Sequence, residues 1–261
     1  MEAEEEKIVE HAKEAIHALT DKKKNWKAKI GSFLWEILII IIAVNLTIWF
    51  HNWNEKRHER KLEKEFLIGI RDDLEAVNGS LDYFFKSINI TIDYYDSVWV
   101  QINEHRIDKE FIDKNSFQLT NTRYFSYDNS RFENFKSSGY LRLIENDTLL
   151  AKITLLYSSN MPSQEEADNM VYGERRRDFI NYIGSKTQID SSGKMHVSEI
   201  LKNPEAKFQI FWQRNYLKER KRQKQQLAQE VGDAINSIDK ELKDRFGYEF
   251  KKEEGKKQEK S

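Results

Sequence analysis

Residues 67–102 read LIGIRDDLEAVNGSLDYFFKSINITIDYYDSVWVQI and carry the clearest pattern in the chain. Their apolar side chains recur at alternating steps of three and four residues, which is the spacing of one stripe along an α-helix. The stripe consists of Leu67, Ile70, Leu74, Val77, Leu81, Phe84, Ile88, Thr91, Tyr95, Val98 and Ile102. Phe85, Ile92 and Trp99 widen it beyond a bare coiled-coil seam. We therefore expect a long helix that ends near His105 and packs into a helical bundle.

The only other segment long enough to pair with this helix lies near the C-terminus. Asn203-Pro204-Glu205 predicts a helix start, and Gly247 follows the expected end at Phe246. Its apolar face is predicted to consist of Phe208, Phe211, Trp212, Leu227, Val231, Ala234, Ile235, Ile238 and Leu242. The fold class expected is therefore all-α, with two long helices that pair antiparallel.

Residues 218–226, KERKRQKQQ, interrupt this apolar face. One interpretation is a contact with nucleic acid or anionic headgroups. The interpretation that we favour is a solvated face near the acids of the first helix, such as Asp72 and Asp82, with no nucleic-acid partner. It predicts that Lys224→Ala changes stability by no more than about 0.5 kcal/mol.

Shorter elements are expected between the two long helices. Residues 107–130 lose the helical period but are rich in aromatic residues, which favours a packed turn region and leaves a binding loop as the alternative. Helices are predicted near residues 131–138 and 147–158, with Gly139 ending the first and Asp147 capping the second. Pro162 is expected to open a further helix that ends near Gly184, and residues 185–194 to form a surface loop.

N-terminal to the heptad pattern, residues 30–50 read IGSFLWEILIIIIAVNLTIWF. At about 1.5 Å per residue this segment reaches about 31 Å, the thickness of a bilayer's hydrocarbon core. The expected membrane-interface residues are Trp26, Lys27, Lys29, Trp35, Trp49 and Trp53, because tryptophan and lysine favour the interfaces. A buried helix of a soluble protein is the alternative interpretation. Glu36 either snorkels toward Lys29 or meets a partner helix, and Asn45 could bond across a helix pair.

The flanking charges predict the sidedness of this single-pass anchor. Lysines crowd residues 22–29 more densely than basic residues crowd 56–64, so we expect the N-terminus inside the cytoplasmic membrane and the large domain in the periplasm. The predicted domains are a cytoplasmic amphipathic and basic tail (1–29), a transmembrane helix (30–50), a helical bundle (51–247) and a disordered charged tail (248–261).

Composition and motifs give no chemistry. The 261 residues hold 43 basic and 44 acidic residues and no cysteine, which excludes disulfides and thiolate sites. The six histidines show no metal-ligand spacing, and neither a phosphate-binding glycine loop nor a nucleophile elbow is present. We therefore expect no catalysis, no cofactor, no metal and no known small-molecule ligand.

Two stretches resemble a known bacterial family. One is FLWEILIIIIAVNLTIWFHNWNEKRHERKLEKEFLIGIRDDLE, in which the apolar run is closed by His51 and by Asn52, Trp53, Asn54 and Glu55. The other is YDNSRFENFKSSGYLRLIENDTLLAKITLLYSS, centred on Ser137, Ser138 and Gly139 and on the run LIEN at 143–146. Both resemble domain of unknown function six thousand and ninety, a single-pass membrane family of Bacteroidota. The resemblance implies no activity, and the small glycine-rich step usual in that family is replaced here by residues 43–45, AVN.

Together these patterns predict a membrane-anchored, non-catalytic interaction or sensing module. Its expected partners are the lipid bilayer and another membrane protein or a second copy of the chain. The alternative is an accessory or structural subunit of a larger membrane complex. A sensor is expected to have a pocket in the half of the bundle distant from the anchor.

Overall fold

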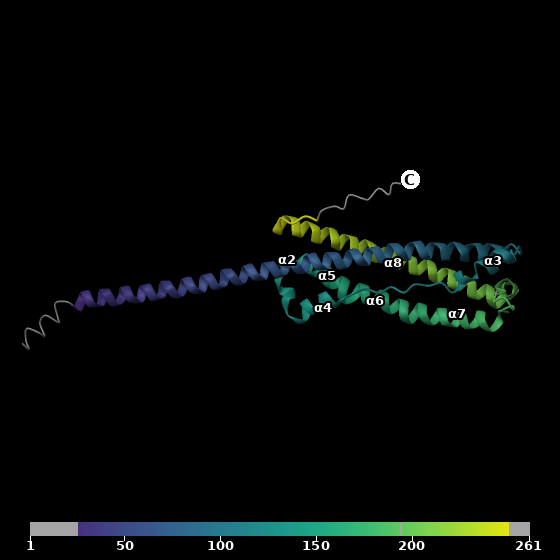
Figure 1. The fold of residues 1–261 in the computed structure, drawn as a ribbon, viewed down its shortest axis with the longest axis horizontal. Coiled ribbons are helices and arrows are strands. Elements are labelled where there is room, and N and C mark those ends of the chain that lie inside the picture. The colour runs from purple at the N-terminus through teal and green to yellow at the C-terminus, as the bar shows by residue number, and fades with distance from the viewer. Residues whose placement is uncertain (1–25, 194, 251–261) are drawn as a thin grey trace, which may run out of the picture. The chain divides into compact units, whose positions relative to one another are not determined.

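A computed structural model describes residues 26–193 and 195–250, and these residues are helical apart from loops and one isolated bridge between Ile189 and Met195 (Figure 1). The chain divides into two compact units, Met1–Arg60 and Lys61–Ser261. The boundary falls after the predicted end of the transmembrane segment. The predicted tail helix before residue 26 and most of the predicted C-terminal tail, from residue 251, lie outside the described residues.

Helix α2 spans Trp26–Asn103 and contains the heptad pattern. Every member of the predicted stripe from Leu67 to Ile102 is buried, so the predicted buried face is confirmed. The helix ends close to the predicted position, because His105 adopts a left-handed backbone with φ of 53° that cannot continue a right-handed helix.

Helix α8 spans Pro204–Phe246 and has the ends that the sequence predicts. The Asn203 side chain accepts a hydrogen bond from the backbone N–H of Glu205 at 2.9 Å, and Pro204 follows as the first helical residue. Gly247 takes the left-handed conformation and donates its N–H to the Lys243 carbonyl at 3.1 Å. Packing continues beyond it, since Tyr248 and Phe250 contact the core.

The apolar face of α8 differs from the prediction at its N-terminal end. The second half is confirmed, because Leu227, Val231 and Ile238 are buried. Phe208, Phe211 and Trp212 are exposed instead, at 58%, 38% and 41%. The buried residues of these first turns are Ala206 and Ile210, which lie on the same stripe as the second half.

The segment after α2 contains short helices. These are α3 (Lys109–Lys114), the 3-10 helix η1 (Ser116–Leu119), α4 (Ser130–Ser137) and the 3-10 helix η2 (Tyr140–Leu143). Gly139 ends α4 with φ of 72°, as predicted for a left-handed helix stop. In the turn region, Phe125 is buried while Phe117 and Tyr124 are exposed, so the aromatic packing predicted there is only partial.

Residues 147–186 form one uninterrupted helical run, which corrects two predictions. The run consists of α5 (Asp147–Leu155), the π-helix η3 (Leu156–Asn160), α6 (Met161–Glu166), the π-helix η4 (Ala167–Tyr172) and α7 (Gly173–Lys186). Pro162 does not open a helix, because the wide π-turn just before it accommodates a ring without an N–H. Asn146, rather than Asp147, is the N-cap and accepts from the Leu149 N–H at 3.1 Å. A final 3-10 helix, η5 (Val197–Lys202), precedes α8.

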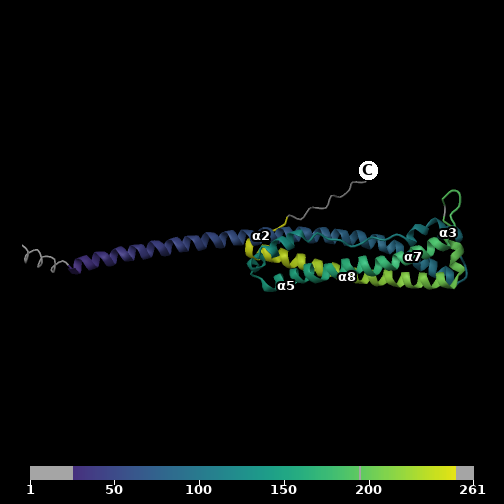
Figure 2. The same ribbon diagram turned by 90° about the horizontal axis from the view of Figure 1, so that it is seen from below.

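Within the unit Lys61–Ser261, α8 lies beside α2 in both views (Figures 1 and 2). Ion pairs join the two helices at three positions along α2, and Asp96 pairs with both Arg214 and Lys218. Arg245 bonds Glu63 at 2.6 Å, Arg71 bonds Asp239 at 3.1 Å, and Lys218 lies 2.9 Å from Asp96. The residue numbers of the α8 partners therefore decrease as the residue numbers along α2 increase.

The buried apolar residues of this unit form two large clusters and one small cluster. The first joins Leu67–Leu81 of α2 to α5 and to Leu227–Leu242 of α8. The second joins Tyr94–Ile102 of α2 to α3, α7 and the start of α8. Between them along α2 lies a small cluster of Phe84, Ile88 and Ile92. The heptad stripe is continuous, whereas the core that it contributes to is divided.

Candidate functional site

The predicted membrane-interface residues lie on an exposed part of α2. Trp35, Trp49 and Trp53 are 64%, 58% and 52% exposed. Among the described residues, α2 is the one helix long and apolar enough to cross a membrane, and none of its most apolar window is buried. The side chains of Trp26, Lys27, Lys29 and Glu36 lie outside the described part of the structure.

Asn45 and Thr47, two polar residues within this apolar run, donate hydrogen bonds to their own helix. Asn45 donates from Nδ2 to the Ile41 carbonyl at 2.7 Å, and Thr47 donates from Oγ1 to the Ala43 carbonyl at 2.9 Å. One of the two N–H groups of the Asn45 amide is therefore paired within α2, which lowers the cost of burying this side chain in hydrocarbon.

The two family-like motifs occupy different environments. Asn52, Asn54 and Glu55 are exposed on α2. In the second motif, Ser137 and Ser138 both donate from Oγ to the Asn134 carbonyl, at 3.1 and 2.8 Å. These hydroxyl contacts, followed by the left-handed Gly139, end helix α4 and turn the chain back on itself.

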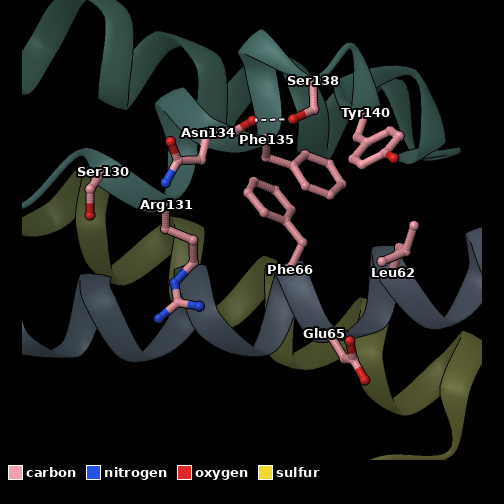
Figure 3. Close-up of a pocket in the computed structure, with 9 residues that line it drawn as sticks. All are labelled: Leu62, Glu65, Phe66, Ser130, Arg131, Asn134, Phe135, Ser138 and Tyr140. Carbon is pink, nitrogen blue, oxygen red and sulfur yellow. Dashed lines mark hydrogen bonds between the residues drawn. The ribbon is translucent and has the colours of Figure 1, made fainter.

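Helix α4 packs on α2 and leaves a groove of about 510 Å³ (Figure 3). Phe135 stacks on Phe66 with ring centroids 3.8 Å apart and an angle of 11° between planes. The groove is also lined by the apolar Leu62 and by polar side chains such as Glu65 and Arg131 (Figure 3). This groove is open and its walls combine apolar and polar groups.

A second contact fixes the run at 143–146 near the same end of the unit. Glu63 is buried and receives a two-pronged contact from Arg245, at 2.6 and 3.1 Å. Arg245 also bonds Glu145 at 2.8 Å, and Asn146 donates to Glu241 at 2.6 Å. Glu145 and Asn146 thus take part in the contacts that join α2, α8 and the start of α5.

The most unusual group of side chains is a buried cluster of Asp168, Arg220 and Lys224. Their side chains are 0%, 3% and 1% exposed. Arg220 donates from Nε and Nη2 to the two carboxylate oxygens of Asp168 at 2.8 and 2.7 Å. Lys224 Nζ lies 3.3 Å from the same carboxylate, which also accepts the Phe125 N–H at 2.7 Å. One carboxylate therefore faces two cations in a site without bulk water.

The remaining donors of this cluster are paired with backbone and neutral groups. Lys224 Nζ donates to the carbonyl and to the side-chain oxygen of Gln164, at 3.0 and 2.9 Å. Arg220 donates to Thr122 Oγ1 at 3.0 Å and to the Arg123 carbonyl. Burial is the main cause that lowers the pKa of Lys224 to about 8; Asp168 opposes this shift and the neighbouring Arg220 adds to it.

This cluster contradicts the predicted solvated face. Residues 218–226 lack apolar side chains, but Arg220 and Lys224 point inward and meet an acid on the π-helix η4 rather than the acids of α2. The charged cluster lies where the apolar core is divided. Lys224 lies over the ring of Phe125, which belongs to the first apolar cluster, and Arg220 lies over the ring of Phe84, which belongs to the small one. π-Helical turns often occur at functional sites.

A cavity of about 610 Å³ lies at the end of the unit where α2 finishes and α8 begins. Ile102, Ile107 and Leu201 supply apolar surface. Lys109, Lys202, Lys207 and His105 supply basic groups at the same cavity, although Lys109 is bonded to Glu199. Its volume is in the range of small-molecule sites.

The described residues contain no group of three metal-ligating side chains. The nearest arrangement is His196, which lies 3.0 Å from Asp190 and 3.6 Å from Asp113. The Asp113 carboxylate accepts hydrogen bonds from the backbone N–H and the hydroxyl of Ser198, at 2.9 and 3.1 Å. Because the Ser198 hydroxyl faces the carboxylate and not the imidazole, these residues do not form a nucleophile with its base.

Comparisons with protein families, with curated proteins and with solved structures find no match to this chain.

Proposed function

We propose that this protein is a membrane-anchored, non-catalytic interaction or sensing module. The observation that carries the proposal is the exposed apolar run of α2, in which Phe33, Ile40 and Trp49 are 60%, 61% and 58% exposed. Exposed apolar surface of this extent is costly in water and favourable in lipid. Membership in domain of unknown function six thousand and ninety stays a proposal, because no family model matches the chain.

The anchor is tested by washing membranes with alkaline carbonate. The full-length protein is expected to stay in the membrane pellet, and a variant that lacks residues 30–50 is expected to be released. A full-length protein that washes off contradicts the proposed anchor.

We further propose that residues 61–247 form an antiparallel helical bundle in the periplasm, with the N-terminus of the chain in the cytoplasm. The reversed order of the α2–α8 ion pairs supports the antiparallel direction. The dense lysines before the apolar run support the sidedness. A reporter that matures only outside the cytoplasm, fused after Ser261, is expected to be active, whereas activity of a cytoplasmic reporter alone reverses the topology.

Sensing is supported by the cavity of about 610 Å³, which lies at the end of α2 farthest along the chain from the anchor. It combines an apolar wall with several basic side chains, so it suits an amphiphilic anion better than a neutral sugar.

The alternative is a subunit of a larger membrane complex. The exposed aromatic surface formed by Phe208, Phe211 and Trp212 favours it, because Trp212 lies 5.6 Å from Phe211 and 6.0 Å from Phe208 and the three make one patch. Co-purification in mild detergent separates the two proposals. A partner that is lost from the Phe208→Ser, Trp212→Ser double variant supports the subunit, and an unaccompanied but stable protein supports the sensor.

A further inference from the structure

A small cleft opens beside the guanidinium of Arg220. It is bounded by α2, by residues 119–122, by α7 and by α8, and its volume is about 30 Å³. A space of that size admits about two water-sized groups. The cleft can therefore hold a small ion or the head group of a larger molecule, but not a whole metabolite.

The charged side chains that line this cleft are all positive. Arg175, Arg176 and Arg220 line it, and none of its lining residues is an aspartate or glutamate. Arg220 is paired with Asp168, but that carboxylate is already shared with Lys224. Positive charge therefore exceeds negative charge on this side of the buried cluster.

The other two arginines make no ion pair within the described residues. Arg176 is half-buried and uses Nε and Nη2 on the Thr120 carbonyl, at 3.0 and 2.6 Å. The Nη1 group of Arg176 has no hydrogen bond within the described part of the chain. Arg175 lies over the Tyr216 ring at 5.3 Å. A guanidinium held in place by a backbone carbonyl keeps its remaining donors in a fixed direction, which suits a planar two-oxygen acceptor.

We propose that this cleft binds the carboxylate of a small organic anion. A carboxylate is planar and small enough for the space, whereas a phosphate group has more oxygen atoms and needs a wider site. Arg176 and Arg220 supply the charge. The neutral side chains of Gln213 and Thr122, which bond the Arg175 carbonyl and Arg220, complete the wall. This cleft shares no lining residue with the end cavity. The assignment rests on the sensing role proposed above and adds to it a second site, for a smaller anion.

Ligand binding here is coupled to the core. Arg220 contacts the cleft on one side and Asp168 on the other, and Asp168 belongs to the π-helix η4. A carboxylate beside Arg220 competes with Asp168 for the same guanidinium. Occupancy of the cleft therefore changes the packing of η4 on α8.

The test uses full-length protein in mild detergent, with sodium acetate as the probe and sodium chloride at equal ionic strength as the reference. Trp212 is one of six tryptophans and stacks on Tyr216 with ring centroids 5.8 Å apart, so the part of the tryptophan fluorescence that Trp212→Phe removes reports on the wall of the cleft. Acetate is expected to give a saturable signal that chloride does not give. Arg176→Gln is expected to weaken acetate binding at least tenfold, as for loss of a charge-assisted hydrogen bond.

Arg177→Gln is the matched control, because Arg177 is an exposed neighbour on α7 that does not line the cleft. Should Arg176→Gln unfold the protein, Arg175→Gln, at a more exposed position, serves in its place. No saturable acetate signal, or an equal signal in the lining and control variants, overturns the proposal. Tighter binding of phosphate than of acetate overturns the carboxylate assignment. The carbonate wash does not depend on acetate binding, so a failure of the proposed anchor can be distinguished from a failure of the proposed carboxylate site.

Discussion

Removing the charge of Asp168 is the sharpest test of the buried cluster. Asp168→Asn keeps the shape of the side chain and an oxygen that can accept the Phe125 N–H, but it leaves Arg220 and Lys224 buried without a counter-charge. Breaking a buried ion pair in this way costs about 3–5 kcal/mol. For a domain of this size, about 2–4 °C of Tm is lost per kcal/mol. We therefore expect Tm to fall by roughly 6–20 °C.

Lys224→Met removes a buried charge but keeps most of the side-chain volume. It therefore separates the effect of charge on Tm from the effect of packing, and Tm is not expected to fall as it does for Asp168→Asn. Methionine fills similar space, Asp168 keeps its two bonds to Arg220, and the cost of burying the ammonium disappears. Its Tm is expected to stay within a few degrees of the wild-type value or to rise. Arg222→Gln, on the same basic run but with a side chain that is 73% exposed, is the control and should change Tm little.

Both variants are measured by thermal unfolding of the full-length protein in detergent, followed by circular dichroism. If Asp168→Asn and Arg222→Gln melt alike, the cluster is not buried and the original interpretation of residues 218–226 as a solvated face is restored.

Three further predictions follow from the packing and from the pKa of Lys224. Leu81→Ala should lower the free energy of unfolding by about 2–5 kcal/mol, because Leu81 is 1% exposed. The same change at Leu155, which is 55% exposed, should lower it much less. Equal losses in denaturant unfolding would argue against the heptad core. Because the folded state has the lower pKa for Lys224, about 8 against 10.5, the unfolded state binds more protons between these pH values. The free energy of unfolding, relative to that of Lys224→Met, should therefore rise by up to about 3 kcal/mol as the pH increases through that window. Parallel plots of stability against pH for the two proteins would contradict this. On this cysteine-free background, cysteines at Arg71 and Asp239 should crosslink, and a crosslink from position 71 to position 214 instead would exclude the proposed helix direction.

The features that the sequence predicted correctly depend on neighbours a few residues apart. The stripe from Leu67 to Ile102 is buried because side chains three and four residues apart share one face of any α-helix. The ends of α8 follow from Asn203, Pro204 and Gly247, whose effects on backbone hydrogen bonds act within one turn. The exposed apolar run of α2 was evident from composition alone.

The buried cluster could have been found in part from the same spacing. Extending the three-and-four step backward from Leu227 reaches Lys224 and Arg220, so both cations occupy positions on the buried stripe of α8. The absence of apolar residues in 218–226 obscured this, because composition was given more weight than register. Applying the register to Phe208 and Trp212 would likewise have placed them off the stripe.

What only the tertiary structure decided is which groups meet across helices. No local rule assigns Asp168 to Arg220, because the pairing depends on how the 147–186 run lies against α8. That run was predicted as two helices, since a proline ordinarily ends a helix, and the two π-helical turns that make it continuous have no signal in the sequence. Periodicity and capping act along the chain and are readable from it, whereas charge pairing and cleft formation depend on distances between segments that only the folded chain sets.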